Sequence, residues 1–146
     1  MRKLIIAACT AGLLAVMSSC GTSRNAASSI KALDGEWKII TVNGQALSPQ
    51  PGEKTAFIGF DVKENRIYGN TGCNNLVGGL QADAANKTIT FGQSGSTRML
   101  CPHMETEEIV LEAMGKVGKY EITDKNKMSL MTADGKTVMT LEKRNK

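Results

Sequence analysis

Histidine, aromatic residues and long apolar runs are scarce in this sequence. His103 is the only histidine, and the 146 residues include one Trp, two Tyr and three Phe. A Ser–His–Asp triad or a cysteine–histidine pair would therefore have to use His103. No apolar run reaches the roughly 20 residues that a transmembrane helix needs. The length suits one ordinary domain, which excludes a multidomain machine.

Excess charge of one sign is also lacking. The chain has 18 Lys and Arg residues against 14 Asp and Glu residues, and its formal net charge is +4. The basic residues are scattered, and no motif combines aromatic with basic side chains as RNA-binding modules do. We therefore expect no nucleic-acid partner.

The N-terminal segment has the features of a secretion signal. Arg2 and Lys3 form a short positive region, and residues 4–17 form an uncharged, mostly apolar run of 14 residues. This run is too short to span a bilayer. Two serines then precede Cys20, an arrangement that resembles a bacterial lipobox, although Met17 stands where Leu is usual. The alternative is an ordinary signal peptide cut elsewhere, with Cys20 as a spare thiol.

The lipobox resemblance implies that residues 1–19 are removed and that Cys20 carries acyl groups such as palmitate. Several acyl chains anchor a protein stably, so the expected partner is the membrane itself. Gly21 rather than Asp follows Cys20, which favours the outer membrane of the cell envelope, facing the periplasm. Residues 20–32 are small and polar and predict a flexible tether. The 127 residues that remain after removal carry 16 basic and 14 acidic residues, a net charge of +2.

Short alternating segments predict strands over most of residues 33–144. These segments are residues 35–42, 56–62, 66–70, 86–92, 119–123, 127–132 and 137–143. Asn43–Gly44 and residues 63–65 are typical of hairpin turns. We therefore expect an α+β domain, a mostly antiparallel sheet curved into a partly closed barrel and packed against one α-helix.

That helix is predicted over residues 103–118. Pro102 suits an early helical position, and Gly118 can cap the end. Core-facing positions recur at spacings of three and four, at Val110, Met114 and Val117, with Leu111 alongside. Glu107 and Glu108 are expected on a solvated face at the favourable N-terminal end.

Two motifs are the most distinctive features, GNTGCNN at residues 69–75 and TRMLCP at residues 97–102. Together they resemble the META-domain family, also called HslJ-like. Further matching parts are Gly35–Trp37, Glu107–Glu108 and Asp134–Lys136. Leu100 and the glycine-rich residues 77–79 depart from the family pattern. The resemblance implies a small β-rich envelope domain with one helix, often linked to stress tolerance, and no accepted catalytic activity.

Cys73 and Cys101 are 28 positions apart. In an oxidising compartment two such cysteines favour a disulfide. In the chain-entropy treatment the closed loop contributes about 3.6 kcal/mol. The alternative is a pair of buried, reduced cysteines.

A metal site is the sharper alternative for this region. Cys73, Cys101 and His103, with Glu105 or Glu107, offer zinc ligands, but their spacing does not match the common zinc motifs. Cysteine catalysis would need a free thiol beside His103, which the expected disulfide would forbid. We therefore predict no metal, no cofactor and no catalytic residues.

The remaining polar residues of the two motifs are the candidate binding surface. We expect Asn70, Asn74, Asn75 and Arg98 to share one surface patch near the Cys73–Cys101 link. The leading hypothesis is a membrane-tethered, non-enzymatic envelope lipoprotein, a binding or structural module in envelope stress tolerance whose protein partner or ligand is unknown. One alternative is a carrier or pilot-type chaperone of lipid or hydrophobic segments, which needs an open apolar cavity between sheet and helix. The other is a metal-binding protein or enzyme around Cys101 and His103.

Overall fold

A computed structural model describes residues 30–145 of the chain. The predicted signal peptide, the predicted acylation site Cys20 and most of the predicted tether lie outside these residues. Residues 30–33, which include the predicted end of the tether, are helical and lie against the domain, where Lys143 Nζ donates to the Ala32 carbonyl at 3.4 Å. No helix in this described part is long and apolar enough to cross a membrane.

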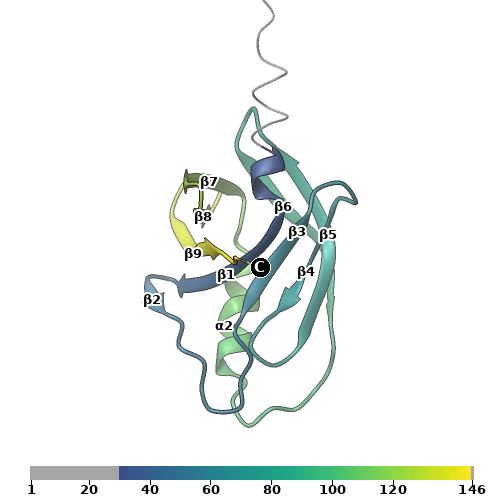
Figure 1. Ribbon diagram of the computed structural model, residues 1–146, viewed down its shortest axis with the longest axis vertical. Helices are drawn as coiled ribbons and strands as arrows, with labels where there is room; N and C mark the ends of the chain where they lie inside the picture. Colours follow the sequence, from purple (N-terminus) through teal and green to yellow (C-terminus); the bar gives the residue numbers. More distant parts are fainter. Residues whose placement is uncertain (1–29, 146) are drawn as a thin grey trace, which may run out of the picture.

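Nine strands and one longer helix follow in chain order over the described residues (Figure 1). They are β1 (Gly35–Val42), β2 (Gln45–Ala46), β3 (Phe57–Asp61), β4 (Arg66–Asn70), β5 (Asn75–Asp83), β6 (Thr88–Ser96), α2 (Glu105–Met114), β7 (Lys119–Asp124), β8 (Lys127–Met131) and β9 (Thr137–Lys143).

The strands form one antiparallel sheet that curves into a ring. Strand order is β2-β1-β3-β4-β5-β6-β7-β8-β9, and β1 also pairs with β9, which brings the two ends of the sheet together. The β6–β7 junction is the weak point, because its only paired residues are Thr88 and Lys119. The predicted α+β class and curved sheet are confirmed, although the ring is not a regular barrel.

Local turn chemistry accounts for the hairpins. Asn43 and Gly44 have φ values of 50° and 81°, as a tight two-residue turn between β1 and β2 requires. Asn65 has a φ of 51° in the turn between β3 and β4. Asparagine tolerates this left-handed region better than most residues, so both predicted turns are confirmed.

Strand β5 was not predicted. Adjacent glycines at 78 and 79 interrupt its alternation of apolar and polar residues. The pairing of β5 with β6 also shifts register between Gly78 and Leu80, as at a β-bulge. The extra residue lies in β6, between Phe91 and Ser94, so β5 itself keeps its alternation and buries Leu76 and Leu80 on one face.

The helix is shorter than predicted at both ends. Pro102 lies before α2, and Gly115 rather than Gly118 is its C-cap residue. The backbone N–H of Gly118 instead donates to the Met131 carbonyl at 2.8 Å, which binds the chain to β8. The core-facing side was predicted correctly, since Val110 and Met114 are buried.

Aliphatic and methionine side chains fill the interior around the single tryptophan. Trp37 is fully buried, and its indole N–H donates to the Leu33 carbonyl at 2.7 Å. Met128 and Met139 from β8 and β9 are also buried. One core therefore joins the ring, α2 and the helical turn at residues 30–33.

Candidate functional site

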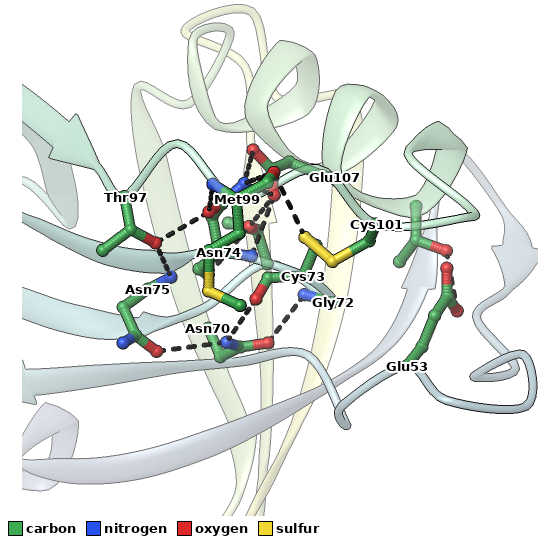
Figure 2. Close-up of a disulfide and its surroundings, with 12 residues drawn as sticks. Glu53, Asn70, Gly72, Cys73, Asn74, Asn75, Thr97, Met99, Cys101 and Glu107 are labelled. Carbon is green, nitrogen blue, oxygen red and sulfur yellow. Dashed lines mark hydrogen bonds between the residues drawn. A yellow bond between two sulfur atoms is a disulfide. The ribbon is translucent and has the colours of Figure 1, made fainter.

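The two sequence motifs meet at one end of the fold. Residues 71–74 connect β4 to β5, and residues 97–101 leave β6 on the way to α2. Figure 2 shows both segments beside the first turns of α2, with the Glu107 side chain directed at Asn74. The site is therefore built from three segments that are distant in sequence.

The Glu107 carboxylate is the centre of this arrangement. Its Oε2 accepts hydrogen bonds of 3.0 Å from the Thr71 hydroxyl, the Asn74 backbone N–H and the Asn74 side-chain amide. The amide also donates to Oε1 at 3.1 Å. Glu107 is 6% exposed, so the expectation that it lies on a solvated face is wrong. The neutral donors around it satisfy a charge whose burial would otherwise be costly.

Asn74 joins the helix to the second motif. Its Oδ1 accepts hydrogen bonds of 2.7 Å from both the Thr97 hydroxyl and the Met99 N–H, and its Nδ2 donates to the Met99 carbonyl at 3.2 Å. One side-chain amide thereby holds the segment after β6 against the loop and α2. The backbone N–H and carbonyl of Met99, which no neighbouring strand in the described residues pairs, thereby have hydrogen-bond partners.

Asn70 shapes the loop itself. Its Oδ1 accepts from the Gly72 N–H at 2.9 Å, and its Nδ2 donates to the Asn75 side-chain oxygen at 3.2 Å. Gly72 has a φ of 114°, and a Cβ there would lie 2.9 Å from the Thr106 methyl group. Glycine is thus required both for the backbone conformation and for the close approach of α2.

Cys73 and Cys101 form the expected disulfide, with their Cα atoms 6.0 Å apart (Figure 2). It links the β4–β5 loop to the segment that precedes α2. Because both sulfur atoms are in this bond, neither is available as a thiolate ligand or nucleophile. His103 is exposed, and residues 30–145 contain no group of three His, Cys, Asp or Glu side chains arranged to hold a metal ion.

The predicted binding patch is only partly at the surface. Asn70 and Asn74 are 3% and 2% exposed, so their side chains hold the loop together and cannot contact a partner. Asn75 and Arg98 are exposed. The expectation of one surface patch is therefore wrong for the two buried asparagines. The sequence shows that these residues are polar, but it does not show that nearby backbone groups use their side chains as hydrogen-bond partners.

Two surface features near the site were not anticipated. Met99 and Leu100 are exposed next to the disulfide, Leu100 to 97%. A recess of about 280 Å³ lies between β6 and the C-terminal half of α2. Its lining residues are Thr90, Phe91, Gly92, Ser94, Leu111, Met114, Gly115 and Val117. A helical spacing of Leu111 with Met114 and Val117 indicates an apolar face, but the sequence does not show that part of it stays uncovered.

Comparison with known structures supports the fold alone, because sequence identities are low. A protein from Burkholderia xenovorans, solved by NMR, matches with a TM-score of 0.59 and 19% identity, and the match covers 100% of both chains. A DUF4847 family protein from Bacteroides vulgatus, solved by crystallography, matches with a TM-score of 0.54 and 17% identity, over 78% of this chain and 95% of the other.

Among curated proteins, none matches this sequence. The model of the META domain family matches residues 29–145 of this chain. This span contains the whole ring, α2 and both motifs. The chain belongs to the META-domain family.

Proposed function

We propose that this protein is a lipid-anchored, non-catalytic binding module of the bacterial cell envelope, acting in envelope stress tolerance. Cys20 would carry the acyl groups, and the domain of residues 30–145 would be held at the outer membrane, facing the periplasm. The signal-like residues 1–19 and the lipobox-like position of Cys20 support the anchor. The disulfide supports an oxidising compartment.

One observation carries the proposal that the module binds rather than catalyses. The reactive side chains around the two motifs bond to one another. The two cysteines form a disulfide, and Glu107 accepts hydrogen bonds from Thr71 and Asn74. The one hydroxyl–carboxylate pair described in this cluster, Thr71 with Glu107, is 1% and 6% exposed, so a substrate cannot reach it as acyl transfer or hydrolysis would require. What the cluster supplies is a rigid end of the fold.

A carrier of lipid or hydrophobic segments is less well supported. Such a function needs an apolar cavity large enough to enclose a chain, and ligand pockets are typically about 300–1,000 Å³. The recess between β6 and α2 is about 280 Å³, and larger hollows of about 340 to 530 Å³ elsewhere on the described residues are, like it, open at the surface and do not enclose a ligand. The interior of the ring is filled by buried core side chains.

The anchor is tested in a bacterium that processes lipoproteins, by feeding an alkyne analogue of palmitate to cells that produce the full chain. We expect the label on the wild type and its loss in Cys20→Ser, with the protein moving from the membrane to the soluble fraction. Cys9→Ser is the matched control and keeps the label, because Cys9 lies in the removed segment. Label that persists in Cys20→Ser, or an unlabelled wild type, would refute the anchor.

A further inference from the structure

Strand β6 has an open edge where the ring is weakly closed. One edge of β6 pairs with β5 over most of the length of the strand. The other edge pairs with β7 only at the first residue of β6. There Thr88 pairs with Lys119, and the Ile89 N–H donates to the Gly118 carbonyl at 3.2 Å. Within residues 30–145, no strand pairs with this side of β6 beyond that point.

The backbone groups on this edge can be assigned from their neighbours. Because the Ile89 N–H points away from β5, alternation also turns the N–H and C=O of Phe91 away from β5. The bulge opposite Gly79 then shifts the phase. Beyond it, the Thr97 N–H donates toward β5, to the Asn75 carbonyl at 3.1 Å, so Ser94 and Ser96 face outward. An unpaired row of this kind is a template for another strand.

The recess runs beside this edge and is bounded by α2. Phe91 and Gly92 border it on the β6 side, and Leu111 and Met114 border it on the helix side. In Figure 1 the chain leaves β6, passes around the end of the molecule farthest from residue 30, and returns along α2. A strand laid along β6 would therefore place alternate side chains beside Leu111, the partly exposed apolar residue on the helix side of a recess that also has polar lining from Thr90 and Ser94.

One exposed glutamate lies beside the helix side of the recess. Glu108 is exposed and lies one turn before Leu111, on the same face of α2. Glu112 is already paired with Lys116 at 2.6 Å, whereas no ion pair joins Glu108 to another residue in the described part of the chain. A basic side chain on the added strand would complement Glu108.

We infer that the β6 edge from Phe91 to Ser96 takes up an extended, apolar and basic segment of a partner polypeptide as an additional strand. Its apolar side chains enter the recess, and its Lys or Arg lies beside Glu108. A second copy of this chain fits less well, because its nearest basic residues, Lys87 and Arg98, lie only at the ends of β6 and residues 90–96 (TFGQSGS) contain none. The inference rests on the proposed binding function and names its surface and class of partner.

The test is hydrogen exchange measured by mass spectrometry on the full chain, purified in detergent from producing cells. The probe is a capped peptide of about nine residues that alternates valine and lysine, a length typical of a long strand. We expect amide exchange over residues 90–97 to slow about tenfold at saturating peptide. The same peptide with N-methyl groups on alternate amides should have no effect, since it cannot complete the ladder.

Two matched pairs of variants locate the contact. Glu108→Gln should weaken peptide binding about twofold to fivefold, whereas Glu105→Gln, an exposed position one turn farther from the recess, should not. Leu111→Ser should weaken it about tenfold, whereas Ile109→Ser, an exposed position away from the recess, should not. Thermal unfolding checks that each variant is folded, and the glutamate pair still tests the contact if Leu111→Ser is unstable.

Several results would overturn the inference. These are no slowing at millimolar peptide, equal slowing by the N-methylated peptide, slowing confined to other strands, or protection of residues 90–97 that depends on protein concentration without peptide. The last result would identify a second copy as the occupant. Each of them leaves palmitate labelling of Cys20 unchanged, and an unlabelled chain can still bind the peptide, so failure of the edge and failure of the anchor are distinguishable.

Discussion

Replacing Glu107 by alanine should destabilise the domain far more than any exposed glutamate on the same helix. The substitution removes the only acceptor for the Asn74 backbone N–H among the described hydrogen bonds. It also removes one of two acceptors for the Thr71 hydroxyl, which keeps the Asn74 carbonyl at 3.1 Å. The Asn74 amide similarly keeps the Met99 carbonyl at 3.2 Å.

The expected loss of stability depends on the hydrogen-bonding groups that Glu107→Ala leaves without a partner. A buried N–H without a partner costs about 1–3 kcal/mol, and each hydrogen bond to a charged group contributes about 1.5–3 kcal/mol. The contributions are not additive, and removing a buried charge recovers part of its desolvation cost. We therefore expect Glu107→Ala to lower the free energy of unfolding by about 3 kcal/mol. Glu107→Gln should cost about 1–2 kcal/mol, because its amide group faces the donor group of Asn74.

Urea unfolding followed by tryptophan fluorescence measures these changes. Trp37 is the single tryptophan and is fully buried, so its emission reports the loss of the core. Glu108→Ala is the control and should change the unfolding free energy by about 0.5 kcal/mol or less, since Glu108 is exposed. In a double-mutant cycle, Asn74→Ala should cost much less when Glu107 is already alanine. A Glu107→Ala effect equal to that of Glu108→Ala would refute the reasoning.

Three further predictions concern other parts of the domain. Reducing the Cys73–Cys101 disulfide should lower the free energy of unfolding by about 3.6 kcal/mol. Urea unfolding with and without reductant measures this change, and an unchanged unfolding midpoint would show that the disulfide does not stabilise the domain. Tyr120→Phe should raise stability by up to about 1 kcal/mol in the same assay, because the buried Tyr120 hydroxyl has no hydrogen-bond partner among the described residues, and a clear loss would reveal one. The Glu64 N–H and then the Arg66 guanidinium lower the pKa of Asp61 below its ordinary 3.8. Its stabilising contribution is therefore present above that value and lost as pH falls through the lowered pKa. Asp61→Asn should flatten part of the stability decline between about pH 5 and pH 2, and an unchanged slope would exclude this contribution.

The fold was predictable wherever local chemistry agrees with tertiary structure. Asn43–Gly44 determines its turn through backbone conformation alone, and the strands around it alternate regularly. Strand β5 was missed because Gly78 and Gly79 carry no side chains that would show the alternation in the sequence, although the strand keeps it in the structure. The C-terminal end of α2 was missed because Gly118 bonds to β8, a partner distant in sequence. Long-range hydrogen bonds, rather than local preference, decide those boundaries.

The site was predictable in its covalent part and not in its polar part. The spacing and inferred compartment of Cys73 and Cys101 were sufficient to expect the disulfide. The burial of Glu107 was not, because Glu in the first turn of a helix is ordinarily solvated and favoured by the helix dipole. Only the arrival of Asn74 and Thr71 beside the helix provides the donors that permit its burial.

The buried motif residues and the exposed surface have different roles in binding a partner. Three of the residues that carry the resemblance to the family are buried: Asn74 is hydrogen-bonded to Glu107, and Cys73 is bonded to Cys101. Buried atoms contact no partner, so these residues specify the domain and not what it binds. Specificity must come from exposed groups that the shared motifs hold in position. The open edge of β6 meets that requirement, because its strand leads directly into the segment held by Asn74 and the disulfide. Changing the recess should then alter binding without unfolding the domain, whereas changing the buried network should unfold the domain and abolish binding together.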